Sequence, residues 1–194
     1  MFKKQWIITL LLLLVPQTGF ADIYEIDPGH THIGFSIKHM IISNVKGKFN
    51  TFSGTAEVDE KDNIKTAVVE IDPASIDTDH EKRDKHLRAP DFLDVKKFPK
   101  MTFKYTRTKS RKGNHYVIVG DLTLHGVTKE VELDMELLGK IKDPWGNHRG
   151  GVTGTAEIDR RDFGIVWNKL LETGGLVVGN KVKISLEVEA ILKK

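Results

Sequence analysis

The sequence contains no cysteine. Disulfides, thiolate catalysis and lipid anchors attached through cysteine are therefore excluded. A hydrophobic core alone must stabilise the fold, and 194 residues are long enough to form one such core. Without a lipid anchor, any contact with a membrane is expected to be transient.

The familiar catalytic and nucleotide-binding motifs are also missing. The sequence has no Gly-x-Ser-x-Gly elbow, no phosphate-cradling loop and no dinucleotide fingerprint. Acidic residues are plentiful, but almost all occupy the outer positions of alternating segments, so no acid–base pair stands out. We therefore assign no catalytic residue, although an enzyme without a named nucleophile is left open.

Only one long apolar run occurs, and it lies at the start of the chain. Lys3 and Lys4 precede the apolar stretch 6–15, and the small residues Gly19 and Ala21 follow it. This order is typical of a secretory signal peptide, and the run is too short to span a bilayer comfortably. We expect residues 1–21 to be cleaved and residues 22–194 to form a single exported domain.

Charge is balanced rather than one-sided. The full chain has 30 basic and 27 acidic residues, and loss of Lys3 and Lys4 leaves 28 against 27, a net charge near +1. The signs are interspersed, which indicates an ordinary solvated surface and gives no reason to expect nucleic acid as a partner.

Alternation of apolar and polar residues is the dominant pattern. It is clearest at 130–138 and recurs at 33–37, 67–71, 101–105, 116–124 and 182–190. Glycine-bearing pairs at 112–114, 125–126, 146–147 and 179–180 predict turns between these segments. About eight antiparallel strands at short spacing indicate an all-β protein, either a sandwich or a closed barrel.

Two segments depart from this alternation. The charged stretch 77–98 predicts one or two short helices across a barrel opening, with Asp77 or Thr78 as the N-cap. The stretch 167–173 is a weaker helical candidate.

Histidines and one arginine-rich segment are the polar clusters that suggest a site. His30 and His32 lie on one side of an extended strand, with His39 further along and Asp27 nearby, a spacing that a zinc site could use. Surface histidines explain the same pattern.

The second polar cluster comprises Arg83, Asp84, His86 and Arg88, within about one and a half helical turns. Arginine forks suit recognition of an anionic or carbonyl headgroup. A solvated helix face held by local ion pairs is the alternative interpretation.

Inward-facing apolar positions are the candidate ligand contacts. They could line a cavity or fill a self-packed core, because both require the same alternation. The predicted lining consists of Phe35, Phe49, Phe52, Phe103, Tyr105, Ile118, Leu133, Met135, Phe163 and Trp167.

Several segments in order along the whole mature chain resemble the YceI family of lipocalin-like, polyisoprenoid-binding proteins. They are residues 24–28, 30–40 (HTHIGFSIKHM), 45–49 (VKGKF), 71–103 (from IDPASID to KMTF), 120–131 (GDLTLHGVTKEV) and 158–165 (IDRRDFGI).

The resemblance implies an elongated eight-stranded antiparallel barrel, with the helical segment near its opening and a long hydrophobic pore. It also implies a periplasmic location, a bound polyisoprenoid such as a quinone tail or polyprenyl lipid in place of any cofactor, and pairing of two protomers. The cluster of Arg83, Asp84, His86 and Arg88 would then contact the ligand headgroup.

Three functional hypotheses follow. The leading one is a periplasmic carrier of a polyisoprenoid. The second is a membrane-embedded outer-membrane barrel, in which the apolar residues of the alternating pattern face outward. The aromatic girdles of such barrels are missing here, since Trp145 and Trp167 are the only tryptophans that remain after the leader. The third is an enzyme acting on a quinone or prenyl compound, with a metal at His30, His32 and His39.

Overall fold

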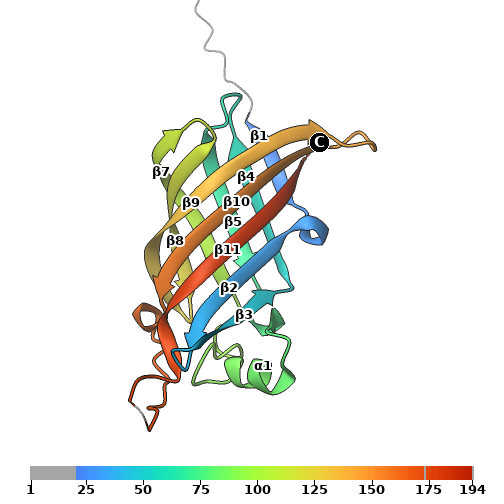
Figure 1. Cartoon of the computed structure of the whole chain (residues 1–194). Helices are drawn as coiled ribbons and strands as arrows, with labels where there is room; N and C mark the ends of the chain where they lie inside the picture. Colours follow the sequence, from blue (N-terminus) through green and yellow to red (C-terminus); the bar gives the residue numbers. More distant parts are fainter. Residues whose placement is uncertain (1–20, 173, 194) are drawn as a thin grey trace, which may run out of the picture.

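A closed antiparallel barrel of eight strands forms the body of the described structure, as the sequence predicts (Figure 1). The computed structural model describes residues 21–172 and 174–193. The predicted signal peptide, residues 1–21, lies almost entirely outside these residues and stays a prediction. The strands are β1 (Asp22–Ile26), β2 (His32–His39), β3 (Ser43–Phe49), β4 (Phe52–Val58), β5 (Ile64–Ile71), β6 (Ile76–Asp77), β7 (Met101–Lys112), β8 (His115–Leu124), β9 (Val127–Lys142), β10 (His148–Asp159) and β11 (Val178–Leu192).

The eleven segments make eight wall strands because three wall strands are composites. β1 and β2 both pair with β11, one beyond the other. β4 pairs with β1 and β3 with β2, while β5 pairs with β4 and β6 with β3. Every wall strand is therefore next to its neighbour in sequence, and the pairing of β1 with β11 closes the ring.

A repeated Ile-Asp signal explains where the chain leaves the wall. Asp27 and Asp72 each precede a proline and cap a short 3-10 helix, η1 (Pro28–His30) or η2 (Pro73–Ser75). The capping carboxylates accept hydrogen bonds from the backbone N–H two residues later, at 3.0 and 2.8 Å. Asp159 caps η3 (Arg160–Phe163) in the same way. Each aspartate thus ends a stretch of strand and redirects the backbone.

The predicted turns are confirmed at three of four places. Residues 113–114, 125–126 and 143–147 connect successive strands from β7 to β10. His125 and Gly126 have φ of 52° and 74°, the left-handed pair that suits a tight hairpin. The turn predicted at Gly179 and Asn180 is wrong, because both residues lie inside β11, where the register to β2 shifts.

The two faces of the wall differ sharply in polarity. On β9, Val131, Leu133, Met135 and Leu137 face the interior, and acidic residues occupy the positions between them. One of those acids, Glu132, forms an ion pair outside the barrel with Lys109 at 2.6 Å. An outer-membrane barrel has apolar residues outside, so the orientation here is the opposite one. None of the helices in the described residues is long and apolar enough to cross a bilayer.

One end of the barrel is covered by the single α-helix of the described chain, α1 (Glu81–Leu87), and the loop that follows it (Figure 1). Its N-cap is His80, whose Nδ1 accepts a hydrogen bond from the backbone N–H of Arg83 at 3.2 Å, and not Asp77 or Thr78 as predicted. The second helical candidate, 167–173, is wrong over its described residues. That segment is a loop with an isolated bridge between Leu170 and Leu176.

Charged side chains tie α1 to the wall. Buried Asp84 accepts hydrogen bonds from the backbone N–H and the hydroxyl of Thr78. Arg88 donates from Nε to the carbonyl of Ala74 at 2.7 Å and from Nη2 to that of Ile76 at 2.6 Å. Arg88 thereby joins the end of α1 to the backbone of the η2–β6 segment.

We expect Arg88→Met to lower the free energy of unfolding by about 2 kcal/mol, because it removes two charge-assisted hydrogen bonds, one of them to the carbonyl of buried Ile76. Urea denaturation followed by circular dichroism measures the change. Lys85→Met, on the exposed side of the same helix, is the matched control. Equal stability of the two variants would contradict this role for Arg88.

Candidate functional site

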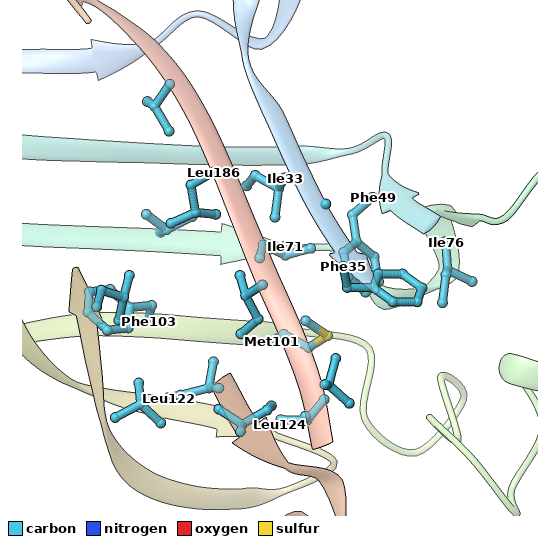
Figure 2. A pocket seen from close by; sticks show the side chains of 18 of the residues that line it. Ile33, Phe35, Phe49, Ile71, Ile76, Met101, Phe103, Leu122, Leu124 and Leu186 are labelled. Carbon is cyan, nitrogen blue, oxygen red and sulfur yellow. The ribbon is translucent and has the colours of Figure 1, made fainter. Parts of the chain in front are cut away.

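A long apolar cavity of about 700 Å³ occupies the barrel interior. Figure 2 shows Ile33, Phe103 and Leu186, from three different strands, directed toward the same interior space. The lining runs from Tyr24, Asp62 and Lys140 at one end to Lys38, His80 and Arg83 at the α1 end. It therefore extends along most of the barrel.

The shape of the cavity follows from strand geometry. On β11 the lining extends from Val178 to Ala190, so the cavity follows the greater part of this strand. The number of strands sets the width of the interior. Such a bore accommodates one slender chain, as expected for a barrel of eight strands.

Glycines on the wall explain why bulky lining residues leave the lumen open. The ring of Phe103 occupies the space where a side chain on Gly120 would start, and the ring of Phe35 does the same at Gly47. Both rings therefore lie along the wall rather than across the interior. A self-packed core would require such side chains to fill the centre.

Seven of the ten predicted lining residues do line the cavity: Phe35, Phe49, Phe103, Ile118, Leu133, Met135 and Trp167. Whether they contact a ligand stays a prediction. Other lining residues that the sequence interpretation did not single out come from β11 and from Ile26, Ile71 and Ile158, which directly precede the capping aspartates. The alternation in β11 and the repeated Ile-Asp pair were the available signals.

Phe52, Tyr105 and Phe163 lie outside the lining, contrary to the prediction. Phe52 is buried at the start of β4, where the β3/β4 composite is interrupted. A register shift after Tyr105 in β7 places this residue beside a separate surface hollow, with its hydroxyl 2.9 Å from that of Thr108. Phe163 belongs to η3 and is 1% exposed within the core that packs beneath α1.

The α1 end of the cavity is cationic. Its polar lining residues are Lys38, His39, His80, Lys82, Arg83, His86 and Arg160. The one carboxylate in the lining, Asp62, lies at the far end in an ion pair with Lys140. Because Lys38, His80, Lys82 and His86 are also exposed, the cavity reaches solvent at the α1 end; at the far end Lys140 is an exposed lining residue.

The predicted headgroup cluster is divided by the structure. Arg83 and His86 line the cavity, whereas Asp84 and Arg88 do not and serve to hold α1 in place. Arg83 is partly committed as well, since it donates from Nε and Nη2 to Thr78 at 2.7 and 2.6 Å. Headgroup binding by Arg83 and His86 stays a prediction.

Arg160 is a buried cation at this end that the sequence interpretation missed. It is 3% exposed and donates to the carbonyls of Gly179 at 2.9 Å and Ile165 at 2.7 Å. Burial lowers the pKa of its guanidinium. Asp159, the acid next to it, forms its ion pair with Arg161 instead. The positive charge of Arg160 is therefore incompletely balanced beside the cavity.

The predicted histidine metal site is not assembled as proposed. His39 lies seven residues beyond His32 on β2, about 23 Å away at the rise of a strand. His30 does approach Asp27, at 2.9 Å, and Glu189 lies close to both. However, Arg149 Nη1 contacts Asp27 at 2.7 Å and Glu189 at 2.6 Å, so a guanidinium already occupies the centre of this cluster.

The same arginine joins a third acid. Arg149 Nε donates to Asp143 at 2.8 Å, and the Asp143 side chain is only 4% exposed. Hydrogen bonds from Arg149 hold the pKa of Asp143 well below its usual range, and they also lower the pKa of Asp27. The network connects β1, the β9–β10 turn and β11, where the barrel closes.

This network predicts a loss of stability in acid. Because both folded-state pKa values are depressed, the contribution is complete well above the unfolded aspartate pKa and is lost as pH falls below about 4. Urea unfolding between pH 7 and pH 2.5 measures the slope. Arg149→Met should make the acid-side slope shallower, whereas an unchanged slope in this variant would count against the network as its source.

Comparison with known proteins places this architecture among related chains. A family model described as a YceI-like domain matches residues 24–190. A UPF0312 protein of Photorhabdus laumondii is 44% identical over 155 residues, covering 78% of this chain and 80% of the relative.

Two solved structures share the fold. The Campylobacter jejuni YceI protein is 33% identical with a TM-score of 0.71, covering 81% of this chain and 90% of that one. A polyisoprenoid-binding domain from Saccharophagus degradans has a TM-score of 0.64 at 15% identity, covering 88% and 98%. The second likeness shows the fold alone.

Proposed function

Since this chain belongs to the YceI-like domain family, we propose that it is a periplasmic carrier that holds one polyisoprenoid chain inside the barrel. The observation that carries this proposal is the continuous, narrow, apolar cavity along the barrel axis. The description of the Saccharophagus degradans domain as polyisoprenoid-binding supports the same ligand class. Periplasmic location rests on the leader-like residues 1–21.

Burial energetics suit a long apolar ligand. Removing hydrocarbon from water is worth about 0.8 kcal/mol per methylene, so a polyisoprenoid partitions out of water almost completely. A bilayer offers the same gain, and extraction from it depends instead on the fit of the bore and on polar contacts. A bore with room for one chain supplies the fit.

The cationic α1 end supplies the polar contacts. Its lining offers ammonium and guanidinium donors and imidazoles but no carboxylate. Such donors recognise groups rich in acceptor oxygens, phosphates most strongly. The ligand is therefore oriented with its headgroup at α1 and its tail toward Asp62 and Lys140.

Aromatic rings complete this end of the cavity. His86 meets the rings of Phe92 and Trp167 edge to face, with centroids 4.8 and 5.2 Å apart. Its Nε2 lies 2.8 Å from Asp91, which fixes the ring orientation. These groups are placed to contact and position a ligand at this end of the cavity.

Narrowing the bore should prevent lipid retention. Ala67 lines the cavity on β5 and Val68, the next residue, is exposed on the outer face. We expect Ala67→Phe to reduce co-purified isoprenoid at least about tenfold, because the ring enters a bore of one-chain width. Val68→Phe should leave it unchanged.

The readout is organic extraction and mass spectrometry of mature protein isolated from periplasm without detergent. If the folded, unmodified protein contains less than about one isoprenoid molecule per hundred protein molecules, the carrier proposal is refuted. Equal lipid content in both variants would refute the assigned bore.

Headgroup recognition is tested separately. Replacing the exposed lining residues Lys38 and Lys82 by methionine should weaken binding of geranylgeranyl diphosphate about tenfold, since each removes a cation near the headgroup. Binding of geranylgeraniol, which lacks the diphosphate, should be nearly unchanged.

Quenching of tryptophan fluorescence reports binding, because Trp167 lines the cavity. The matched control replaces Lys46 and Lys85, two exposed lysines that lie outside the lining. Loss of affinity for both ligands to the same degree would place the headgroup elsewhere.

A further inference from the structure

Exposed apolar side chains gather at the tip of the barrel beside α1. They are Met40, Ile41 and Ile42 of the β2–β3 turn and Val166, Leu170 and Leu176 of the segment before β11, and together we call them the apolar tip. Ile42 is 86% exposed and Leu170 is 79% exposed. Large aliphatic side chains this exposed on neighbouring loops indicate an interaction surface.

Specific contacts hold the two loops of the apolar tip together. The backbone N–H of Met40 donates to the carbonyl of Val177 at 2.8 Å, and that of Val177 donates to Lys169 at 2.9 Å. Ile41 lies against Gly175, where a Cβ would come within 2.7 Å of its Cδ1. The tip is therefore one surface built from two segments far apart in sequence.

The backbone presents Ile41 in a costly conformation. Its φ is 66°, in the left-handed region that a β-branched residue rarely adopts. Such strain persists only where the surrounding structure imposes it. Here the tight β2–β3 turn imposes it, since Met40 has a φ of 49° as well, and Ile41 is 64% exposed at this turn.

The apolar tip borders the cationic end of the cavity. Lys38 and His39 directly precede it on β2, and Val177 and Val178 directly follow it before and within β11; all four line the cavity. Figure 1 shows the segment before β11 projecting from the barrel at the same end as α1. A surface that receives the tip is thus brought to the opening of the cavity.

Charge around the tip identifies the kind of surface. From Ile37 to Ala56 the chain has three lysines and no acidic residue, whereas the other loop has one residue of each sign, Lys169 beside Leu170 and Glu172 two positions further on. The lysine excess therefore lies on the β2–β3 side of the tip, where Lys38 precedes Met40 by two positions. Exposed aliphatic side chains beside such cations match a bilayer with anionic headgroups, where the apolar groups insert and the cations stay at the surface.

We propose that the apolar tip docks the protein reversibly on anionic phospholipid bilayers and places the cavity opening against the lipid. The proposal goes beyond the carrier function but rests on it for its purpose, since an isoprenoid then passes between bilayer and bore without crossing water. Reversible binding is expected because the inserted area is small and no lipid anchor can be attached through cysteine.

The test is flotation of the mature protein with vesicles of phosphatidylglycerol and phosphatidylcholine, compared with vesicles of phosphatidylcholine alone. A tip variant carries Ile41→Ser, Ile42→Ser and Leu170→Ser. A matched control carries Leu138→Ser, Ile141→Ser and Trp145→Ser, which are 63%, 67% and 80% exposed on β9 and the β9–β10 turn. Each variant loses three exposed apolar side chains, so folding is perturbed equally little.

We expect the unmodified protein and the control variant to float with the anionic vesicles. The amount of tip variant that floats should be at least about tenfold lower. High salt should weaken flotation. Equal flotation of both variants, or flotation of none of the three proteins, would overturn the docking proposal. Dimerisation lost only in the tip variant, without vesicle binding, would assign the tip to a second copy and overturn it as well.

A second readout separates docking from carrying. Geranylgeranyl diphosphate added from solution does not pass through a bilayer, so the tip variant should bind it normally. The same variant should take up geranylgeranyl diphosphate from vesicles more slowly than the unmodified protein. Normal binding from solution without any vesicle association would refute docking and leave the carrier function intact. Vesicle association without isoprenoid binding would refute the carrier function instead.

Discussion

Closure of the sheet between β1 and β11 is the constraint on which the cavity depends. Tyr24 to Ile26 pair with Ala190 to Leu192, and the backbone N–H of Asp27 donates to the carbonyl of Glu189 at 2.9 Å. Arg149 adds side-chain bonds across the same joint. A closed ring has no free edge to aggregate and a width set by strand number, so side-chain size alone decides whether its interior is filled. Gly47 and Gly120 let aromatic rings lie flat on the wall, and the interior stays open.

The charged helix shows how one sequence motif can serve two purposes. Asp84 and Arg88 form hydrogen bonds with backbone groups near the strand ends that α1 covers, so their charges stabilise the fold. Arg83 and His86, one turn apart on the same helix, lie at the cavity. Residue types alone could not separate these roles, because the same guanidinium fork suits a backbone carbonyl and a ligand oxygen, and Arg83 itself donates to the carbonyl of Thr78 while lining the cavity. The position of Arg160 beneath them required the η3 turn, which no periodicity reveals.

Much of the fold could be predicted because period-two alternation is a local signal that burial enforces, as in β9 and β11. The motifs resembling a known family supplied the barrel and the helical cover. The composite strands were missed, although the repeated Ile-Asp-Pro at 26–28 and 71–73 carries a capping signal readable in sequence. Tyr105 could not be placed, since a one-residue register shift in β7 changes its surroundings while leaving the alternation intact. The apolar tip was hidden because exposure of Ile42 or Leu170 depends on loop positions, not on pattern.

Backbone pairing between neighbouring strands is not equally extensive around the barrel. β5 pairs with β7 over Val68–Ile71 and Met101–Lys104, and the remainder of the two strands diverges around the surface hollow beside Tyr105. Arg111 bridges that gap by donating to the carbonyl of Lys61 at 2.7 Å and to the Asn63 side chain at 3.0 Å. Side-chain bridges yield more easily than a backbone ladder, so we expect the barrel wall to open most readily along this seam. Any occupant bulkier than the resting interior would then be accommodated first between β5 and β7.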